Sequence, residues 1–136
     1  MSPGLADFAG LWQINRKIDD KTGLGAGTLI GEARFLRDGA GYRYAETGTL
    51  CFARQPPMEA RQSYLWREDG QGIAVLFPDG RPFHSFVPDD QPIAAHWCDP
   101  DQYDVAYAFS AWPDWQSTWR VKGPRKDYEM ITFYRR

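Results

Sequence analysis

The sequence predicts an all-β protein that folds as an antiparallel up-and-down β-barrel of about ten strands. Short runs rich in aromatic and β-branched residues alternate with turn residues along the whole chain. The 13 glycines and 10 prolines are spread over these turns. No long segment shows helical periodicity, so strands are the expected elements throughout.

The expected strands follow one another at short spacing. The turns between them are rich in Asp, Gly and Pro, as in RDGAG, EDGQG and PDGR. Such spacing favours a series of hairpins, and closure of the meander removes its exposed edges. Single helical turns are expected at residues 7–9 and 56–61. The strands are expected at residues 8–18, 27–37, 41–50, 61–68, 72–77, 82–87, 92–98, 103–110, 115–122 and 128–136.

Length and composition limit the class of protein. The 136 residues fit one domain, expected over residues 1–136. A net charge of -2 gives no basic footprint for nucleic acid, and no apolar run is long enough for a membrane span. No secretory signal is visible, so Cys51 and Cys98 are expected to be free thiols in a cytoplasmic protein. The oligomeric state is left open.

The first expected strand reads FAGLW, residues 8–12. A Gly-x-Trp at this place resembles the calycin superfamily, which includes lipocalins and fatty-acid-binding proteins. The resemblance implies that Trp12 plugs the closed end of the barrel. It also implies that an arginine from a late strand packs over this tryptophan, with Arg120 and Arg135 as the candidates.

A second resemblance covers nearly the whole chain. It rests on FAGLWQINRKIDD, DGRPFHSF, HWCDPDQYDVAYAF and WRVKGPRKDYEMITFYRR. These segments resemble an uncharacterised bacterial and fungal domain family. The resemblance implies a small calycin-like barrel and carries no catalytic residue or cofactor.

The polar residues near HWCDPDQYDV form the first candidate site. If residues 82–87 and 92–98 form a hairpin, His84 lies opposite His96 and the two side chains share a face. Cys98 shares that face because it is two residues from His96. A four-residue turn then places Tyr103 opposite Cys98, while Asp99 and Asp101 serve as turn residues.

The next strand continues the same inward face. It carries Val105, Tyr107 and Phe109 at alternate positions. Many of the seven tyrosines alternate with polar residues in the same way. A buried tyrosine hydroxyl needs a hydrogen-bond partner. These tyrosines therefore favour a polar-lined cavity over a fatty-acid tunnel.

Arginines supply further candidates. Arg81 follows the turn Asp79-Gly80 and can lie at the barrel mouth as an anchor for an anion, or as an ordinary solvated turn residue. Fatty-acid-binding proteins hold a carboxylate with late-strand Arg and Tyr, a part that Arg120 and Tyr128 can play here. However, if Trp119 points inward, Arg120 points outward.

Three functions remain open from the sequence. The leading prediction is a barrel that binds a small, partly polar aromatic molecule, anionic or uncharged, in its interior. The first alternative is a small enzyme, metal-assisted or cofactor-free, that uses His84, His96 and Cys98. The second is an interaction domain with a filled core, anchored by Trp97 and the AWPDW turn. The predicted ligand-binding residues are His84, His96, Tyr103, Arg81, Cys98, Tyr107, Arg120 and Tyr128.

Overall fold

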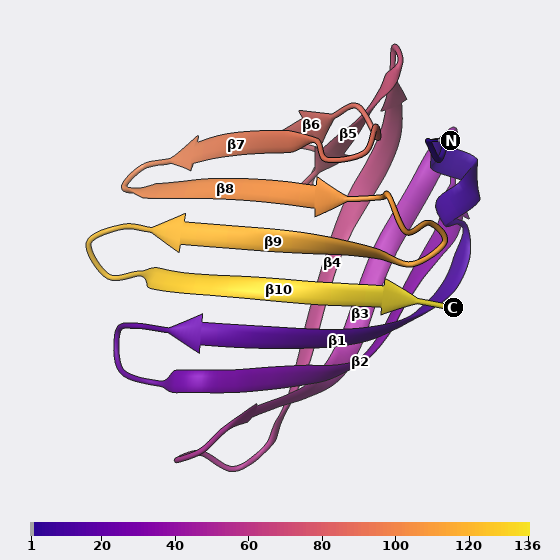
Figure 1. The fold of residues 1–136 in the computed structure, drawn as a ribbon. Coiled ribbons are helices and arrows are strands. Elements are labelled where there is room, and N and C mark those ends of the chain that lie inside the picture. The colour runs from indigo at the N-terminus through magenta and orange to yellow at the C-terminus, as the bar shows by residue number, and fades with distance from the viewer. Residues whose placement is uncertain (1) are drawn as a thin grey trace.

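A computed structural model describes residues 2–136 as one ten-stranded antiparallel sheet, curled into a nearly closed barrel (Figure 1). This confirms the predicted fold class. Among the described residues, no helix is long and apolar enough to cross a membrane. A 3-10 helix η1(Leu5–Phe8) precedes strands β1(Gly10–Asp20), β2(Gly25–Asp38), β3(Gly41–Phe52), β4(Met58–Asp69), β5(Gly72–Leu76), β6(Pro82–Phe86), β7(Ile93–Cys98), β8(Asp101–Ala108), β9(Trp115–Lys122) and β10(Asp127–Arg135).

The strand order is that of an up-and-down meander. It runs β6-β5-β4-β3-β2-β1-β10-β9-β8-β7, so β1 and β10 pair with each other and join the two halves of the barrel. Their register runs from Gln13 opposite Arg135 to Asp20 opposite Tyr128. Strands β6 and β7 are the two edges of the sheet, and the barrel seam lies between them.

The predicted hairpin between residues 82–87 and 92–98 is wrong. The segment that connects β6 to β7 bonds to β8, with the amide of Tyr107 donating to the carbonyl of Pro92 over 2.9 Å. The amide of Phe109 likewise donates to the carbonyl of Asp90 over 2.9 Å. Pro92 has no N–H of its own and cannot extend a ladder with β6. The connection therefore carries the chain from one edge of the sheet to the other.

Two glycines mark a bend in the long strands β2 and β3. Gly31 lies directly opposite Gly48 in the register. A Cβ at Gly31 would overlap the backbone of Thr47, and one at Gly48 would lie 2.7 Å from Leu29 Cδ2. Glycine is needed where two backbones approach this closely, so this pair lets the sheet bend toward closure.

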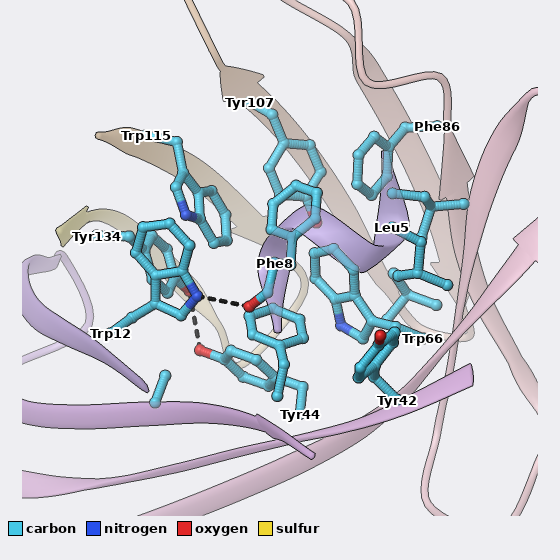
Figure 2. Packing of buried hydrophobic residues seen from close by; sticks show 14 of the residues in the cluster. Leu5, Phe8, Trp12, Tyr42, Tyr44, Trp66, Phe86, Tyr107, Trp115 and Tyr134 are labelled. Atoms are coloured by element: carbon cyan, nitrogen blue, oxygen red, sulfur yellow. Dashed lines mark hydrogen bonds between the residues drawn. The ribbon is translucent and has the colours of Figure 1, made fainter. Parts of the chain in front are cut away.

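The closed end of the barrel is built on η1. Phe8 and Trp12 are fully buried there, and the Trp12 Nε1 donates to the carbonyl of Phe8 over 2.8 Å. Figure 2 shows the aromatic rings that gather around Phe8. Trp12 thus occupies the place that the calycin resemblance implies. The helical turn expected at residues 7–9 overlaps η1, which ends at Phe8, whereas residues 56–61 form no helix and include the start of β4.

The arginine over Trp12 is neither Arg120 nor Arg135, and this prediction is wrong. Arg136 fills the place, with its guanidinium carbon 3.9 Å from the Trp12 ring centroid. Tyr134 points inward on β10, so Arg135 points outward by alternation. Arg136 follows the end of β10 and is free to fold back over η1.

Candidate ligand-binding cavity

The barrel encloses a cavity of about 740 Å³ that runs from the closed end to a mouth at the opposite end. Buried residues such as Trp66 and Trp115 line its closed end, and exposed residues such as Arg81 and Cys98 line its mouth. The core is therefore not filled. Six of the seven tyrosines contribute to the wall, as the alternation predicted: Tyr44, Tyr64, Tyr103, Tyr107, Tyr128 and Tyr134.

A buried ion pair lies on the inner wall. Arg16 Nη1 and Nη2 donate to Glu46 Oε2 and Oε1, each over 2.8 Å, and Arg16 Nε donates to Thr132 Oγ1 over 2.7 Å. Tyr44 OH donates to the same Oε1 over 2.5 Å. It also contacts Tyr134 OH at 2.9 Å (Figure 2). Such a two-pronged pair is a strong, directional contact.

Strand β2 leaves room for this pair. Arg16 on β1 is opposite Leu29, and Glu46 on β3 is opposite Ala33. The inward position halfway between them on β2 is Gly31, which has no side chain. The glycine that allows the bend therefore also lets the two charged side chains meet across β2.

Burial sets the protonation states around the pair. Burial opposes the charge on Arg16, but the hydrogen bond and charge of Glu46 outweigh it and the pKa of Arg16 is raised. Burial first, and then the charges of its neighbours, holds the pKa of Tyr44 well above its ordinary value. Burial and the charge of Glu46 raise the pKa of Tyr134 to about 12. At neutral pH this wall holds one neutralised ion pair among uncharged phenols.

The two histidines line the cavity from opposite sides of the seam. His84 on β6 is buried and its Nε2 lies 2.7 Å from Tyr107 OH. Burial, and to a smaller extent the nearby His96, lowers the pKa of His84 to about 4. His84 is therefore uncharged at neutral pH. Its Nδ1 is buried and has no protein partner among the described residues.

A bulge on β6 turns two successive side chains inward. Val75 pairs with His84 and Leu76 with Pro82, so Phe83 has no partner of its own on β5. Both Phe83 and His84 are buried as a result. The shift is typical of a β-bulge, which re-aims side chains at such sites.

Phe83 crosses the cavity as the centre of an aromatic stack. Its ring centroid lies 5.1 Å from that of Trp119, with an interplanar angle of 13°. The centroid of Phe77 lies 4.6 Å away, with an interplanar angle of 23°. It also meets the imidazoles of His84 at 4.7 Å and His96 at 5.2 Å. The parallel rings give this part of the cavity a flat aromatic wall. The contact of Phe83 on β6 with His96 on β7 bridges the seam through side chains.

The mouth carries several of the predicted residues. Arg81 is exposed, pairs with Asp79 over 2.7 Å, and lies 5.4 Å from the Phe77 ring centroid. Tyr103 OH accepts a hydrogen bond from Lys126 Nζ over 2.9 Å. This bond, together with the one to Asp101, raises the pKa of Lys126.

Most of the predicted ligand-binding residues lie together. Arg120 does not reach the cavity: it lies on the outer face, pairs with Asp127 over 2.7 Å and bonds the Tyr128 carbonyl over 3.3 Å. This placement agrees with the alternation from Trp119, which lines the interior. The wall includes the other seven predicted residues, His84, His96, Tyr103, Arg81, Cys98, Tyr107 and Tyr128.

The pairing predicted for Tyr103 is wrong by two residues. Tyr103 lies opposite His96, and Cys98 lies opposite Asp101. The β7–β8 turn therefore holds only residues 99 and 100. A shift of two residues keeps each side chain on its face, so His96 and Tyr103 still point inward.

The residues proposed for the enzyme alternative do not form a metal cluster. Within residues 2–136, no three His, Cys, Asp or Glu side chains come close enough to hold a metal ion. His84 is engaged by Tyr107, and Cys98 is exposed at the rim. The anchors expected for a filled interaction domain also differ: Trp97 is exposed, but Trp115 is buried in the core and Trp112 packs against it.

Two functional candidates were missed from the sequence, namely Arg16 and Glu46. Their signal was present in the strand pattern. Arg16 is two residues from the inward residue Ile14 and four from Trp12, and Glu46 is two residues from Tyr44 and four from Tyr42. Residues at such spacing share one face of a strand. Charged residues in strands are usually solvated, so an inward pair was not expected.

Solved structures share the fold. The chain superposes with a TM-score of 0.61 on an S-type phycobiliprotein lyase from Guillardia theta, at 8% identity, over 96% of this chain and 87% of that one. It superposes with a TM-score of 0.60 on a protein of unknown function of the DUF3598 family from Nostoc punctiforme, at 11% identity, over 98% of this chain. The match covers 48% of that protein, so the chain spans about half its length.

Sequence comparison supplies the family. No curated protein shows detectable sequence similarity to the chain. A family model, described as a family of unknown function, matches residues 8–136, from Phe8 in η1 to the residue that follows β10. The matched segment includes every strand of the barrel and the whole cavity wall. The chain belongs to the DUF6314 family.

Proposed function

We propose that this protein binds one small, partly polar aromatic molecule inside its barrel. The observation that carries the proposal is the cavity of about 740 Å³, whose wall joins stacked aromatic rings to a buried polar network. Ligand sites typically measure about 300–1,000 Å³ and combine apolar walls with a few placed polar groups. The cavity matches both criteria.

The candidate contacts are distributed along the cavity. Near the closed end Arg16 offers N–H groups, and in the middle His84 and Tyr107 form a hydrogen-bonded pair on the wall. Tyr128 and His96 lie nearer the mouth, where Arg81 forms part of the rim. Trp119, which lines the cavity and is only partly buried, supplies a flat surface on which an aromatic ring can stack.

Fold similarity is compatible with this proposal. The Guillardia theta neighbour is named as a phycobiliprotein lyase, so a similar fold occurs in a protein of that name. At 8% identity the similarity concerns the fold alone. The two free cysteines, Cys51 and Cys98, fit the cytoplasmic location that we propose with this function.

The test uses N-phenyl-1-naphthylamine, an uncharged dye whose fluorescence rises in apolar surroundings. We expect saturable binding of one dye per protein. Ala60→Trp places an indole in the cavity wall and should abolish the signal. Ala95→Trp is the matched control, because Ala95 is exposed on the outer face of β7. Absence of saturation, or equal binding by the two variants, would overturn the proposal.

A further inference from the structure

Every charged group of the inner cavity wall is neutralised within the protein. Arg16 binds Glu46 through two bonds of 2.8 Å, and the side chains of Arg16 and Glu46 are only 13% and 7% exposed. Tyr44 occupies Glu46 Oε1 as well, over 2.5 Å. Both oxygens of the carboxylate are therefore in use, and the pair adds no net charge to the wall.

The other titratable groups near the pair are uncharged at neutral pH. Burial lowers the pKa of His84 to about 4 and holds the pKa of Tyr107 well above its ordinary value. The mouth arginine, Arg81, is already paired with Asp79. A charged ligand group that reached the inner wall would find no free counter-charge among the described residues.

The wall nevertheless retains hydrogen-bond donors. A guanidinium has five N–H hydrogens. The bonds to Glu46 and Thr132 use three, which leaves two on Arg16. A ligand carbonyl oxygen can accept from these hydrogens without bringing charge. A ligand carboxylate at the same place would lose its hydration and lie beside the like charge of Glu46.

We infer that Glu46 makes the cavity select uncharged planar aromatic molecules that bear a carbonyl oxygen over aromatic carboxylates. The inference deepens the proposed function and rests on it. Glu46 acts as a specificity residue because it cancels the charge of Arg16 while leaving two of its donors free. The aromatic side chains that line the cavity, among them Trp119, favour a flat ligand.

Three naphthalenes of nearly equal shape separate charge from hydrogen bonding. 2-Acetonaphthone has a carbonyl, 2-naphthoate has a carboxylate that is ionised at pH 7, and 2-isopropylnaphthalene has neither. Each is titrated against the wild-type protein, with dissociation constants from displacement of N-phenyl-1-naphthylamine. We expect the ketone to bind at least roughly tenfold more tightly than the carboxylate. It should bind about three- to tenfold more tightly than the hydrocarbon.

The Glu46→Gln variant tests the residue itself. The amide removes the negative charge beside Arg16, so 2-naphthoate should gain affinity by roughly tenfold relative to 2-acetonaphthone. Glu68→Gln is the matched control, because Glu68 is exposed on β4 and does not line the cavity. It should keep the wild-type ranking. If Glu46→Gln does not fold, the wild-type ranking of the three probes decides.

The outcomes separate the inference from the proposed function. If all three probes bind and 2-naphthoate binds most tightly, the inference is overturned and the proposed function stands. Equal affinities for the ketone and the hydrocarbon overturn the role of the carbonyl oxygen. If no probe binds saturably, the proposed function fails and the inference fails with it.

Discussion

The guanidinium carbon of Arg136 lies 3.9 Å from the centroid of the Trp12 indole, so the residue after β10 covers the buried tryptophan of β1. Arg136 also donates to the carbonyls of Ala9, over 3.0 Å, and Asp7, over 2.5 Å. One side chain thus ties the end of β10 to η1 and to the start of β1. The closed end of the barrel depends on this link as well as on its apolar packing.

Arg136→Ala should therefore destabilise the barrel. The loss of a cation–π contact and of two hydrogen bonds should lower the free energy of unfolding by about 1–3 kcal/mol. Urea denaturation followed by tryptophan fluorescence measures the change. Arg135→Ala is the control and should stay within about 0.5 kcal/mol, because Arg135 is exposed on the outer face. Equal effects of the two substitutions would contradict this role for Arg136.

Phe8→Ala should have the largest effect among aromatic truncations at the closed end. Phe8 has no exposed surface and lies within 5.8 Å of the ring centroids of five other aromatic residues. Its truncation should cost about 3–5 kcal/mol of unfolding free energy, since the cavity left behind cannot refill. Phe133→Ala removes the same atoms from a side chain that is 41% exposed. A Phe133 effect as large as that of Phe8 would be inconsistent with the packing described.

The buried ion pair should show strong coupling in a double-mutant cycle. Glu46→Leu leaves Arg16 charged and buried without its partner, which should cost about 3–5 kcal/mol. Arg16→Met with Glu46→Leu replaces both charges by apolar groups and should recover most of that loss. Chemical denaturation of wild type, Glu46→Leu, Arg16→Met and the double variant gives the coupling energy. Additive effects would show that the two side chains do not stabilise each other.

His84 should make stability depend on pH between about 6.5 and 4. Its pKa is about 4 in the folded protein against an ordinary value of 6.5, so the unfolded chain binds the proton first as the pH falls. The stability due to the neutral imidazole is thus complete above pH 6.5. It should decline by about 3 kcal/mol as the pH falls to 4.

The measurement for His84 is a series of unfolding free energies at several pH values. His84→Gln should flatten the curve in this range, because glutamine does not titrate and can still bond Tyr107. His96→Gln is the control that retains the buried imidazole and should retain the slope. The assignment fails if wild type and His84→Gln lose stability in parallel.

The local features of the fold were predictable from the sequence. Alternation placed Val105, Tyr107 and Phe109 inside, because the side-chain period of a strand needs no knowledge of the rest of the fold. Turn residues located the strands for the same reason. The calycin resemblance carried by Gly-x-Trp implied that Trp12 lies at the closed end, although Trp112, Trp115 and Arg136, which pack on it, are far along the chain.

Features that depend on closure were not predictable in this way. A hairpin between β6 and β7 looked natural along the chain, but the barrel closes by pairing β1 with β10 and leaves those strands as edges. The bulge that turns Phe83 inward depends on how β6 meets β5. Arg16 and Glu46 find each other only because Gly31 lies between them on β2. The pairing of β1 with β10 and the contact of Arg16 with Glu46 join residues far apart in the sequence.

The seam between β6 and β7 has a consequence for how molecules of this protein meet one another. Unpaired strand edges invite sheets of separate molecules to join, which leads to aggregation. Here the edges are short, five and six residues, and Pro82, Pro88 and Pro92 lie in or beside them without N–H donors. Proline interrupts a continuous ladder at such an edge. These three prolines let the barrel keep a discontinuity in its wall without offering a template for intermolecular sheet growth.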